Sequence, residues 1–274
     1  MTATAAQVAG HFGELMQGRI GADGPLALIS LPCAALRLSA TARPARGLSV
    51  HTASGGQIIS PQRAARFLAS LGLSLPARVT LRAQMPVGAG AGASTAALVA
   101  LAQLAGWQGS PDNLARACLR AEGASDPLML PNAERLLWAS REGRVLARLP
   151  ALPAFDILGG FWGPPSPTQA ADLHFPDISS LLPAWIDAAR SQNLDEIARL
   201  ATTSAIATLQ LRGPANDPSA ALATALGAKG FFIAHTGSAR GLIFARGGVP
   251  AGGRAMLRAA GLHGTLVFGH RPQP

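Results

Sequence analysis

The apolar and polar positions of the chain alternate between short strand-like runs and longer helix-like ones. Ser60 and Ser110, each followed by a proline, mark two helix starts, because serine caps the first amides and proline fits the first turn. Gly123 marks a helix end. We expect strands at 26–38, 48–52, 78–84, 155–161, 231–235, 242–245 and 265–269, and a strand pair over 136–149 turning at Glu142-Gly143. We expect helices at 60–72, 94–107, 110–123, 178–191, 194–211, 218–226 and 254–261.

The order of these elements indicates the fold class. Strands come first, and helices and strands are mixed afterwards without regular alternation, which is typical of α+β proteins. The segment Phe161–Thr168 carries three prolines and is the candidate hinge. We therefore expect an α+β fold in two closely packed halves, residues 1–160 and residues 161–274.

Composition excludes two classes of protein. Among 274 residues, 49% are hydrophobic and 14% are charged, which excludes intrinsic disorder. No apolar run approaches the ~18 residues of a membrane span, so we expect no membrane partner. Cys33 and Cys118 are too few for a disulfide framework and lack metal-site spacing, and no signal sequence is evident, so we expect a reducing cytoplasm.

The net charge of +9 raises the question of nucleic acid. Of 23 Lys and Arg residues, Lys229 is the only lysine, and the arginines are scattered along the chain rather than clustered. We therefore attribute the positive charge to a general preference for arginine over lysine and not to a nucleic-acid-binding surface. A few of the arginines could steer anionic ligands into a cleft. The sequence leaves the quaternary state open, and a homodimer is compatible with it.

A glycine-rich stretch between a predicted strand and a predicted helix is the most informative segment. Its glycines free the backbone so that successive N–H groups can point into one concavity, and the helix start adds its positive dipole end. Phosphate could be held there without lysine. The other interpretation is a tight turn that packs a helix on a strand, since no Walker pattern or clean dinucleotide motif is present. The segment comprises Pro86, Val87, Gly88, Ala89, Gly90, Ala91, Gly92, Ala93, Ser94 and Thr95.

This stretch resembles the ATP-phosphate motif of the GHMP kinase superfamily, although Ala91 and Ala93 replace family residues and remove the first hydroxyl. Two more blocks resemble the L-threonine kinase branch of cobalamin biosynthesis, often named for propanediol utilization. They are Gly10–Gly21 (GHFGELMQGRIG) and Ala234–Leu242 (AHTGSARGL). The resemblance covers about residues 10 to 245, and it departs at Val8–His11, where the family has Cys-Pro-Gly.

The resemblance implies a ribosomal-protein-like N-terminal α/β half that binds ATP, packed on a ferredoxin-like C-terminal half. It implies ATP and Mg²⁺ as cofactors, and L-threonine or a similar hydroxy amino acid as the small-molecule substrate. Ser94 would contact metal or phosphate, with support from Thr95. Glu14, Gln17, Thr236, Gly237 and Ser238 would shape the acceptor site.

Two acids near the end of the predicted helix at 110–123 are candidates for the chemistry. The four-residue separation of Glu122 and Asp126 could place both carboxylates at one cleft edge, one toward metal and one toward a substrate hydroxyl. By resemblance Asp126 is the candidate catalytic base and Glu122 the metal ligand. The alternative for Asp126 is a helix cap or a turn residue before Pro127.

Other residues have simpler interpretations beside the functional ones. Thr236–Ser238 could be only a hairpin turn, and His235 is expected to be a core histidine. Arg240 could clamp a carboxylate or phosphate, or could be a solvated surface residue. The four tryptophans are expected in the core or in a subunit contact.

The sequence therefore predicts a small-molecule kinase acting on L-threonine. The same fold acting on homoserine, serine or 1-amino-2-propanol remains open, because such substrates differ by as little as a methyl group or a carboxylate. A non-catalytic ligand sensor also remains open, because fold constrains function weakly and the first serine of the phosphate motif is missing.

Overall fold

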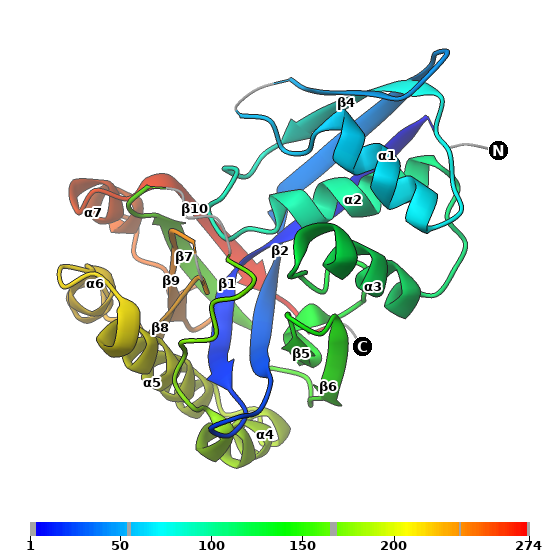
Figure 1. Cartoon of the computed structure of the whole chain (residues 1–274). Coiled ribbons are helices and arrows are strands. Elements are labelled where there is room, and N and C mark those ends of the chain that lie inside the picture. The colour runs from blue at the N-terminus through cyan, green and yellow to red at the C-terminus, as the bar shows by residue number, and fades with distance from the viewer. Residues whose placement is uncertain (1–3, 54–55, 165–168, 236, 273–274) are drawn as a thin grey trace.

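The computed structural model describes residues 4–53, 56–164, 169–235 and 237–272. Within them, the strands are β1 (Ala5–Arg19), β2 (Leu26–Pro44), β3 (Ser49–Thr52), β4 (Ala77–Ala83), β5 (Leu136–Ala139), β6 (Arg144–Arg148), β7 (Phe155–Phe161), β8 (Gly230–Ile233), β9 (Ala239–Phe244) and β10 (His263–His270). They form one curled sheet in the order β10-β7-β9-β8-β1-β2-β4-β3, and the β5–β6 pair joins it at β2 (Figure 1).

The helices lie mostly in two groups on this sheet, and the last helix packs separately. They are α1 (Pro61–Ser70), α2 (Ala93–Leu104), α3 (Pro111–Glu122), α4 (Leu182–Arg190), α5 (Leu194–Arg212), α6 (Ser219–Ala225) and α7 (Gly253–Ala259), with 3₁₀ turns at Ala133–Arg135 and Ser179–Leu181. Figure 1 shows α1, α2 and α3 together beside β2 and β4, and α5 and α6 beside β8, with α4 packed on α5. Helix α7 packs against β7 and β10. This arrangement confirms the expected α+β class.

Capping residues set the helix ends as their chemistry predicts. Ser60 Oγ accepts a hydrogen bond from the Arg63 amide at 3.2 Å, and Ser110 Oγ accepts one from the Asn113 amide at 3.3 Å. Gly123 ends α3 with φ of +75°, a conformation that favours glycine. The predicted starts of α1 and α3 and the predicted end of α3 are therefore confirmed.

The sheet contains one long strand that the sequence analysis did not predict. β1 lies between β2 and β8, pairs with β2 along most of its length, and pairs with β8 at Glu14 and Ile233. Its residues from Gly10 to Gln17 are all buried. β1 therefore joins the two parts of the sheet, and it carries several residues of the site described below.

Three predicted elements differ in extent. The strand expected at 26–38 continues to Pro44 as β2, and β9 begins at Ala239, within the segment expected to be a turn. The helix expected at 178–191 is a 3₁₀ turn followed by α4. In addition β7, which the expected boundary at residue 160 assigns to the first half, pairs with β9 and β10 of the second.

Aromatic contacts tie the strands together around Phe12 of β1. Its ring meets Phe161, Phe232 and Phe268 edge-on at centroid distances of 5.5, 6.3 and 5.6 Å. Such edge-to-face pairs add to the stabilisation from burial. Of the four tryptophans expected in the core or in a subunit contact, Trp138 and Trp185 are fully buried, and Trp107 and Trp162 are partly buried. Both cysteines are buried and free.

None of the helices in the described part of the chain combines the length and the apolar character that a bilayer span needs.

Candidate active site

A cavity of about 290 Å³ opens at the start of α2. The glycine-rich loop before α2 forms one wall. The principal polar side chains come from β1, α1, the first turn of α2, the end of α3 and the segment after it, the turn between β5 and β6, and the segment after β8. These are His11, Glu14, Arg63, Ser94, Thr95, Glu122, Asp126, Arg141 and His235. The fold thus brings together residues that are separated by more than two hundred positions in sequence, such as Glu14 and His235.

The glycine-rich loop has the backbone conformation that its sequence suggests. Gly88, Gly90 and Gly92 have φ values of +76°, +72° and +77°, where other residues are strained. Gly92 is the N-cap of α2 and provides no side-chain hydrogen bond to the first turn. Because a helix start carries free N–H groups and a positive dipole end, this wall of the cavity suits an anion.

The loop is held by close backbone contacts on two sides. A Cβ on Gly10 would lie 2.5 Å from the Ala91 carbonyl oxygen, and one on Gly237 would lie 2.2 Å from that of Ala89. The amide of Ser238 donates to the same Ala89 oxygen at 3.1 Å. Gly237 and Ser238, expected to shape the substrate pocket, thus lie against the loop and outside the wall of this cavity. Thr236 lies outside the described residues.

Ser94, Thr95 and Glu122 form a cluster of oxygen atoms beside the loop. Both hydroxyls donate to the Glu122 carboxylate, and the Thr95 bond measures 2.9 Å. Burial raises the pKa of Glu122 to about 7, although hydrogen bonds from the two hydroxyls oppose this. Mg²⁺ is commonly bound by one or two carboxylates together with substrate phosphates, so Ser94 and Glu122 fit a magnesium site next to a phosphate loop.

Asp126 lies directly across from the start of α2. Its amide donates to Thr95 Oγ1 at 3.4 Å, and the preceding Ser125 carbonyl accepts a hydrogen bond from Trp138 Nε1 at 2.7 Å. A Cβ on Gly92 would lie 3.2 Å from Asp126 Oδ2. The carboxylate faces the loop and the cavity, and within the described residues no helix starts beside it.

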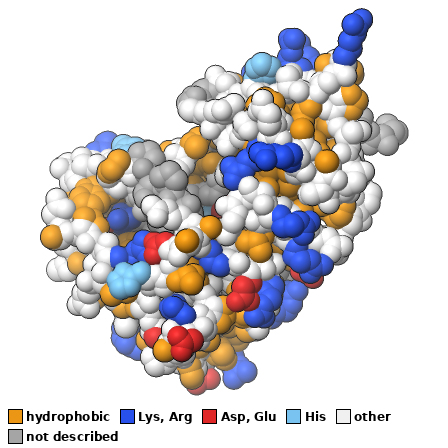
Figure 2. Space-filling view, in the orientation of Figure 1, with side chains coloured by type: hydrophobic (Ala, Val, Ile, Leu, Met, Phe, Trp, Pro, Cys, Tyr) orange, Lys and Arg blue, Asp and Glu red, His pale blue; other side chains and the backbone are white. Residues whose placement is uncertain are grey.

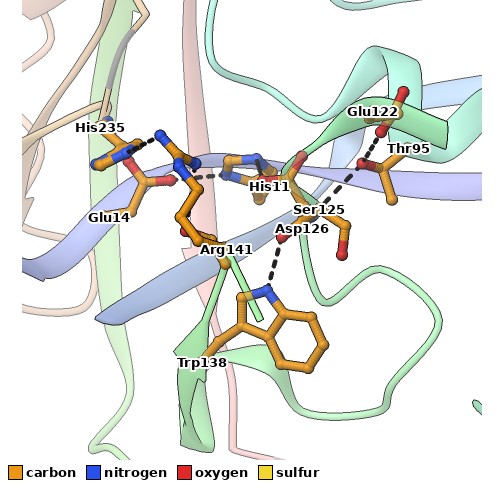
Figure 3. A network of polar contacts seen from close by, with 10 residues as sticks. His11, Glu14, Thr95, Glu122, Ser125, Asp126, Trp138, Arg141 and His235 are labelled. Atoms are coloured by element: carbon orange, nitrogen blue, oxygen red, sulfur yellow. Dashed lines mark hydrogen bonds and ion pairs between the residues drawn. The ribbon is translucent and has the colours of Figure 1, made fainter. Parts of the chain in front are cut away.

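His11 links Asp126 to Glu14, as Figure 3 shows. Its Nε2 lies 3.4 Å from Asp126 Oδ1, and its Nδ1 lies 3.4 Å from Glu14 Oε1. Burial by itself lowers the pKa of His11, but the two carboxylates outweigh it and raise the pKa to about 9. Burial pushes the pKa of Asp126 up, and the charge and hydrogen bonding of His11 more than compensate, so the pKa is lowered. An imidazolium thus lies between two acids, and Asp126 is ionised.

The sequence analysis did not select His11 as a functional residue. The only signal was its place in the Gly10–Gly21 block, at a point where the chain departs from the family pattern.

Of the two β1 residues expected at the acceptor site, one lines the cavity. Glu14 does so, and its second oxygen accepts a hydrogen bond from the His235 amide. Burial raises the pKa of Glu14 to about 7, against the opposing charge of His11. Gln17 lies apart from the cavity: its side-chain amide donates to the Ile233 carbonyl at 3.0 Å, and its backbone amide donates to Ser204 Oγ at 3.0 Å. Gln17 thus connects β1 to β8 and α5.

His235 was expected to be a core histidine, and it is buried, but it also lines the cavity. Its ring stacks on Phe175 at 4.1 Å, and the Arg212 guanidinium lies over the same Phe175 ring at 4.0 Å. Burial, with the charges of Arg141 and Arg212, lowers the pKa of His235 to about 3. The imidazole is therefore neutral.

Arg240 is neither a solvated surface residue nor part of this cavity. It is buried, and its Nε pairs with Asp217 at 2.7 Å. The surface interpretation is therefore wrong, because a neighbouring acid compensates the charge inside the protein. On the face seen in Figure 2, other Lys and Arg side chains are spread over both parts of the molecule.

Part of the chain matches a known protein family. Residues 60–129 match the family model described as the GHMP kinases N terminal domain. This segment contains the glycine-rich loop, Glu122 and Asp126. The chain matches no protein of curated function.

Solved structures share the fold over nearly the whole chain. Homoserine kinase from Cytophaga hutchinsonii has a TM-score of 0.65 at 14% identity, over 98% of this chain and 95% of that one. Phosphomevalonate kinase from Streptococcus pneumoniae has a TM-score of 0.66 at 13% identity, over 99% and 100%. Mevalonate pyrophosphate decarboxylase from Streptococcus pyogenes has a TM-score of 0.65 at 13% identity, over 100% and 99%. These likenesses establish the fold, and the family match with the kinases among them supports a phosphotransferase that acts on a hydroxyl group.

Proposed function

We propose that this chain, which has the GHMP kinase fold, is an ATP- and Mg²⁺-dependent kinase that phosphorylates the side-chain hydroxyl of L-threonine. The product would supply the aminopropanol linker of cobalamin. One observation carries the proposal for the reaction: the ionised carboxylate of Asp126 faces the start of α2, 3.2 Å from where a Cβ of Gly92 would stand. An acceptor hydroxyl that donates to this carboxylate would therefore lie beside the loop that binds the phosphates.

Each part of the cavity has a role in this reaction. The N–H groups of the loop and of the first turn of α2 bind the phosphates of ATP. Ser94 Oγ and Glu122, which contact each other, would hold Mg²⁺, and the ion would offset the negative charge on the phosphate oxygens. Asp126 would accept the proton of the acceptor hydroxyl as its oxygen bonds to the γ-phosphorus, while the bond from that phosphorus to the β,γ-bridging oxygen breaks and ADP leaves. His11 keeps Asp126 ionised by lowering its pKa.

The choice of L-threonine rests on the two sequence blocks that resemble the cobalamin branch. Gly10–Gly21 supplies His11 and Glu14 to the cavity wall, and Ala234–Leu242 supplies His235. The second block also supplies Ser238, which holds the phosphate loop. Both blocks therefore contain residues at or beside the site. In this proposal residues 1–160 form the half that binds ATP, and residues 161–274 form the C-terminal half that packs against it.

An assay of ADP release tests the proposal. The wild-type protein is incubated with ATP and Mg²⁺ and with L-threonine, homoserine, serine or 1-amino-2-propanol in turn, and the products are identified by mass spectrometry. We expect L-threonine to give the highest kcat/KM and O-phospho-L-threonine as the product. A higher kcat/KM with homoserine than with L-threonine would contradict L-threonine as the acceptor and identify a homoserine kinase instead. Background rates with all four acceptors would contradict a kinase of this substrate class and favour a ligand sensor.

A further inference from the structure

Arg141 lies in the turn between β5 and β6 and has no role in the chemistry described above. It lines the same cavity as Asp126 and is half-buried. Figure 3 shows Arg141, His235 and Glu14 on one side of Asp126, and Thr95 and Glu122 on the other. Arg141 therefore lies across Asp126 from Glu122, the proposed magnesium ligand, and on the same side as Glu14, which is expected at the acceptor site.

The guanidinium of Arg141 has only neutral partners. Its Nη1 donates to Ser140 Oγ at 3.4 Å, and its Nη2 lies 3.2 Å from the Gln169 carbonyl and 3.3 Å from Nε2 of the neutral His235. Its Nε is buried without a hydrogen-bond partner in the described part of the chain. Across the described ranges, no carboxylate oxygen lies within 4.0 Å of this group, whereas Arg212 and Arg240 are each paired with an aspartate.

A half-buried cation with an unused N–H group is costly unless an anion completes it. Burial lowers the pKa of Arg141. The charges of Asp172 and Asp126 oppose this lowering without reversing it, and the charge of Arg212 adds to it. The guanidinium remains charged in any protein. It is planar, and its paired donors match the two oxygens of a carboxylate.

The second arginine of the cavity belongs to the opposite side. Arg63 Nε donates to the Ala121 carbonyl at 2.8 Å, next to Glu122, which places this guanidinium at the nucleotide side of the cavity. Each arginine is thus available to a different anion: Arg63 to the phosphates of ATP, and Arg141 to an anionic group of the acceptor.

Resting on the proposed kinase activity, we infer that Arg141 binds the carboxylate of the acceptor. The cavity would then select a hydroxy acid or hydroxy amino acid over the matching amino alcohol. Arg141 binds the acceptor in the ground state and in the transition state alike, so its removal should raise KM more than it lowers kcat.

Paired acceptors test this inference. L-threonine and 1-amino-2-propanol share the amine and the hydroxyl and differ by the carboxylate. In Arg141→Gln, we expect KM for L-threonine to rise by about 10- to 100-fold, the range for a lost charge-assisted hydrogen bond. KM for 1-amino-2-propanol and KM for ATP should stay unchanged. Arg141→Lys should restore part of the affinity, because it returns the charge without the planar fork.

Arg144→Gln is the matched control, because Arg144 lies in the same hairpin, is exposed and pairs with Glu142. It should leave all three KM values unchanged. Equal losses on both acceptors, a rise in KM for ATP, or no change in Arg141→Gln would each overturn the inference.

A binding experiment tests the role of Arg141 independently of the proposed kinase activity. Calorimetric titration of L-threonine and of 1-amino-2-propanol into the wild type and into Arg141→Gln needs no turnover. If the wild type transfers no phosphate to either acceptor, the kinase proposal fails, and the titration still decides on Arg141. Binding of L-threonine that weakens selectively in the variant supports the carboxylate site, and equal or absent binding in both proteins contradicts it.

Discussion

His11 Nε2 lies 3.4 Å from Asp126 Oδ1, and 115 positions of sequence separate the two residues (126 − 11). The imidazolium is held by a second carboxylate, Glu14, at the same distance on its other side. A buried cation between two acids keeps one of them, Asp126, ionised at the wall of the cavity where a base is needed.

Asp126→Asn should abolish phosphoryl transfer while ATP still binds. The variant keeps the shape of the side chain and removes its basicity, and general-base catalysis contributes about 10²- to 10⁴-fold to rate. We expect kcat to fall by that range, measured as ADP release with L-threonine, with an unchanged Kd for ATP. A variant that turns over like the wild type would remove Asp126 from the chemistry.

His11→Gln should shift the pH profile of kcat. Without the imidazolium, the pKa of Asp126 rises, because His11 is what holds it down. The acidic limb of the profile should therefore move to higher pH, while KM for ATP is unaffected. An acidic limb at the same pH in both proteins would show that His11 has no influence on the base.

His11 should also stabilise the fold in a pH-dependent way. Its pKa is raised from 6.5 to about 9 in the folded protein, so folding favours the protonated form. The contribution is fully present below pH 6.5 and is lost as the pH rises through about 9. The difference in free energy of unfolding between the wild type and His11→Gln, measured by urea denaturation, should shrink across that range. A difference that grows with pH would show that folding favours the neutral form of His11 and would contradict this prediction.

Glu122→Gln should weaken the binding of Mg²⁺ specifically. We expect the Mg²⁺ concentration for half-maximal activity to rise by about 10- to 100-fold, a range seen when metal-site residues are changed. Because the pKa of Glu122 is about 7, Mg²⁺ affinity in the wild type should fall as the pH drops below that value, where the carboxylate becomes protonated. This dependence should be absent from the variant. If both proteins respond to Mg²⁺ and pH alike, the ion is held elsewhere.

Gly92→Ala should impair both activity and stability, whereas Gly72→Ala should affect stability alone. Both glycines have positive φ, +77° and +71°, and alanine in that region costs roughly 1–2 kcal/mol. Around Gly72 no atom lies within 4 Å of an added Cβ, but at Gly92 it would meet His11 and Leu128 at 2.9 Å. Displacing His11 should disturb the base, which a kcat comparison of the two variants measures. Equal kcat values in these variants would contradict a tight fit of the loop.

The sequence predicts most of the elements because their signals are local. Ser60 and Ser110 cap their helices within three residues, and the glycines from Gly88 to Gly92 shape the loop by their own φ values. β1 escaped prediction for a physical reason. Every residue of β1 from Gly10 to Gly18 is buried, so the usual polar alternation is lost over this part of the strand. Its register shifts near Gly10 and Glu14 weaken the pattern further.

The site was predictable where residues are close in sequence and not where they meet across the fold. Ser94, Glu122 and Asp126 come from one family-like segment, and the structure brings them to one cavity. His11 and Arg141 carry no local signal, because what distinguishes them is the charge of distant neighbours. The surface position considered for Arg240 was wrong for the same reason, because Asp217, which is distant in sequence, compensates the charge of Arg240 inside the protein.

The bond between Glu14 and the His235 amide spans 221 positions, so it has a consequence for biosynthesis. A ribosome makes Glu14 early and its partner late, and contacts of such separation form slowly because a long loop must close first. During synthesis the phosphate loop and Asp126 emerge well before β8 can pair with β1. The nascent chain therefore carries the glycine-rich loop and Asp126 before Ser238 can hold the loop and before His235 can complete the cavity wall, so full turnover must wait for the last strands.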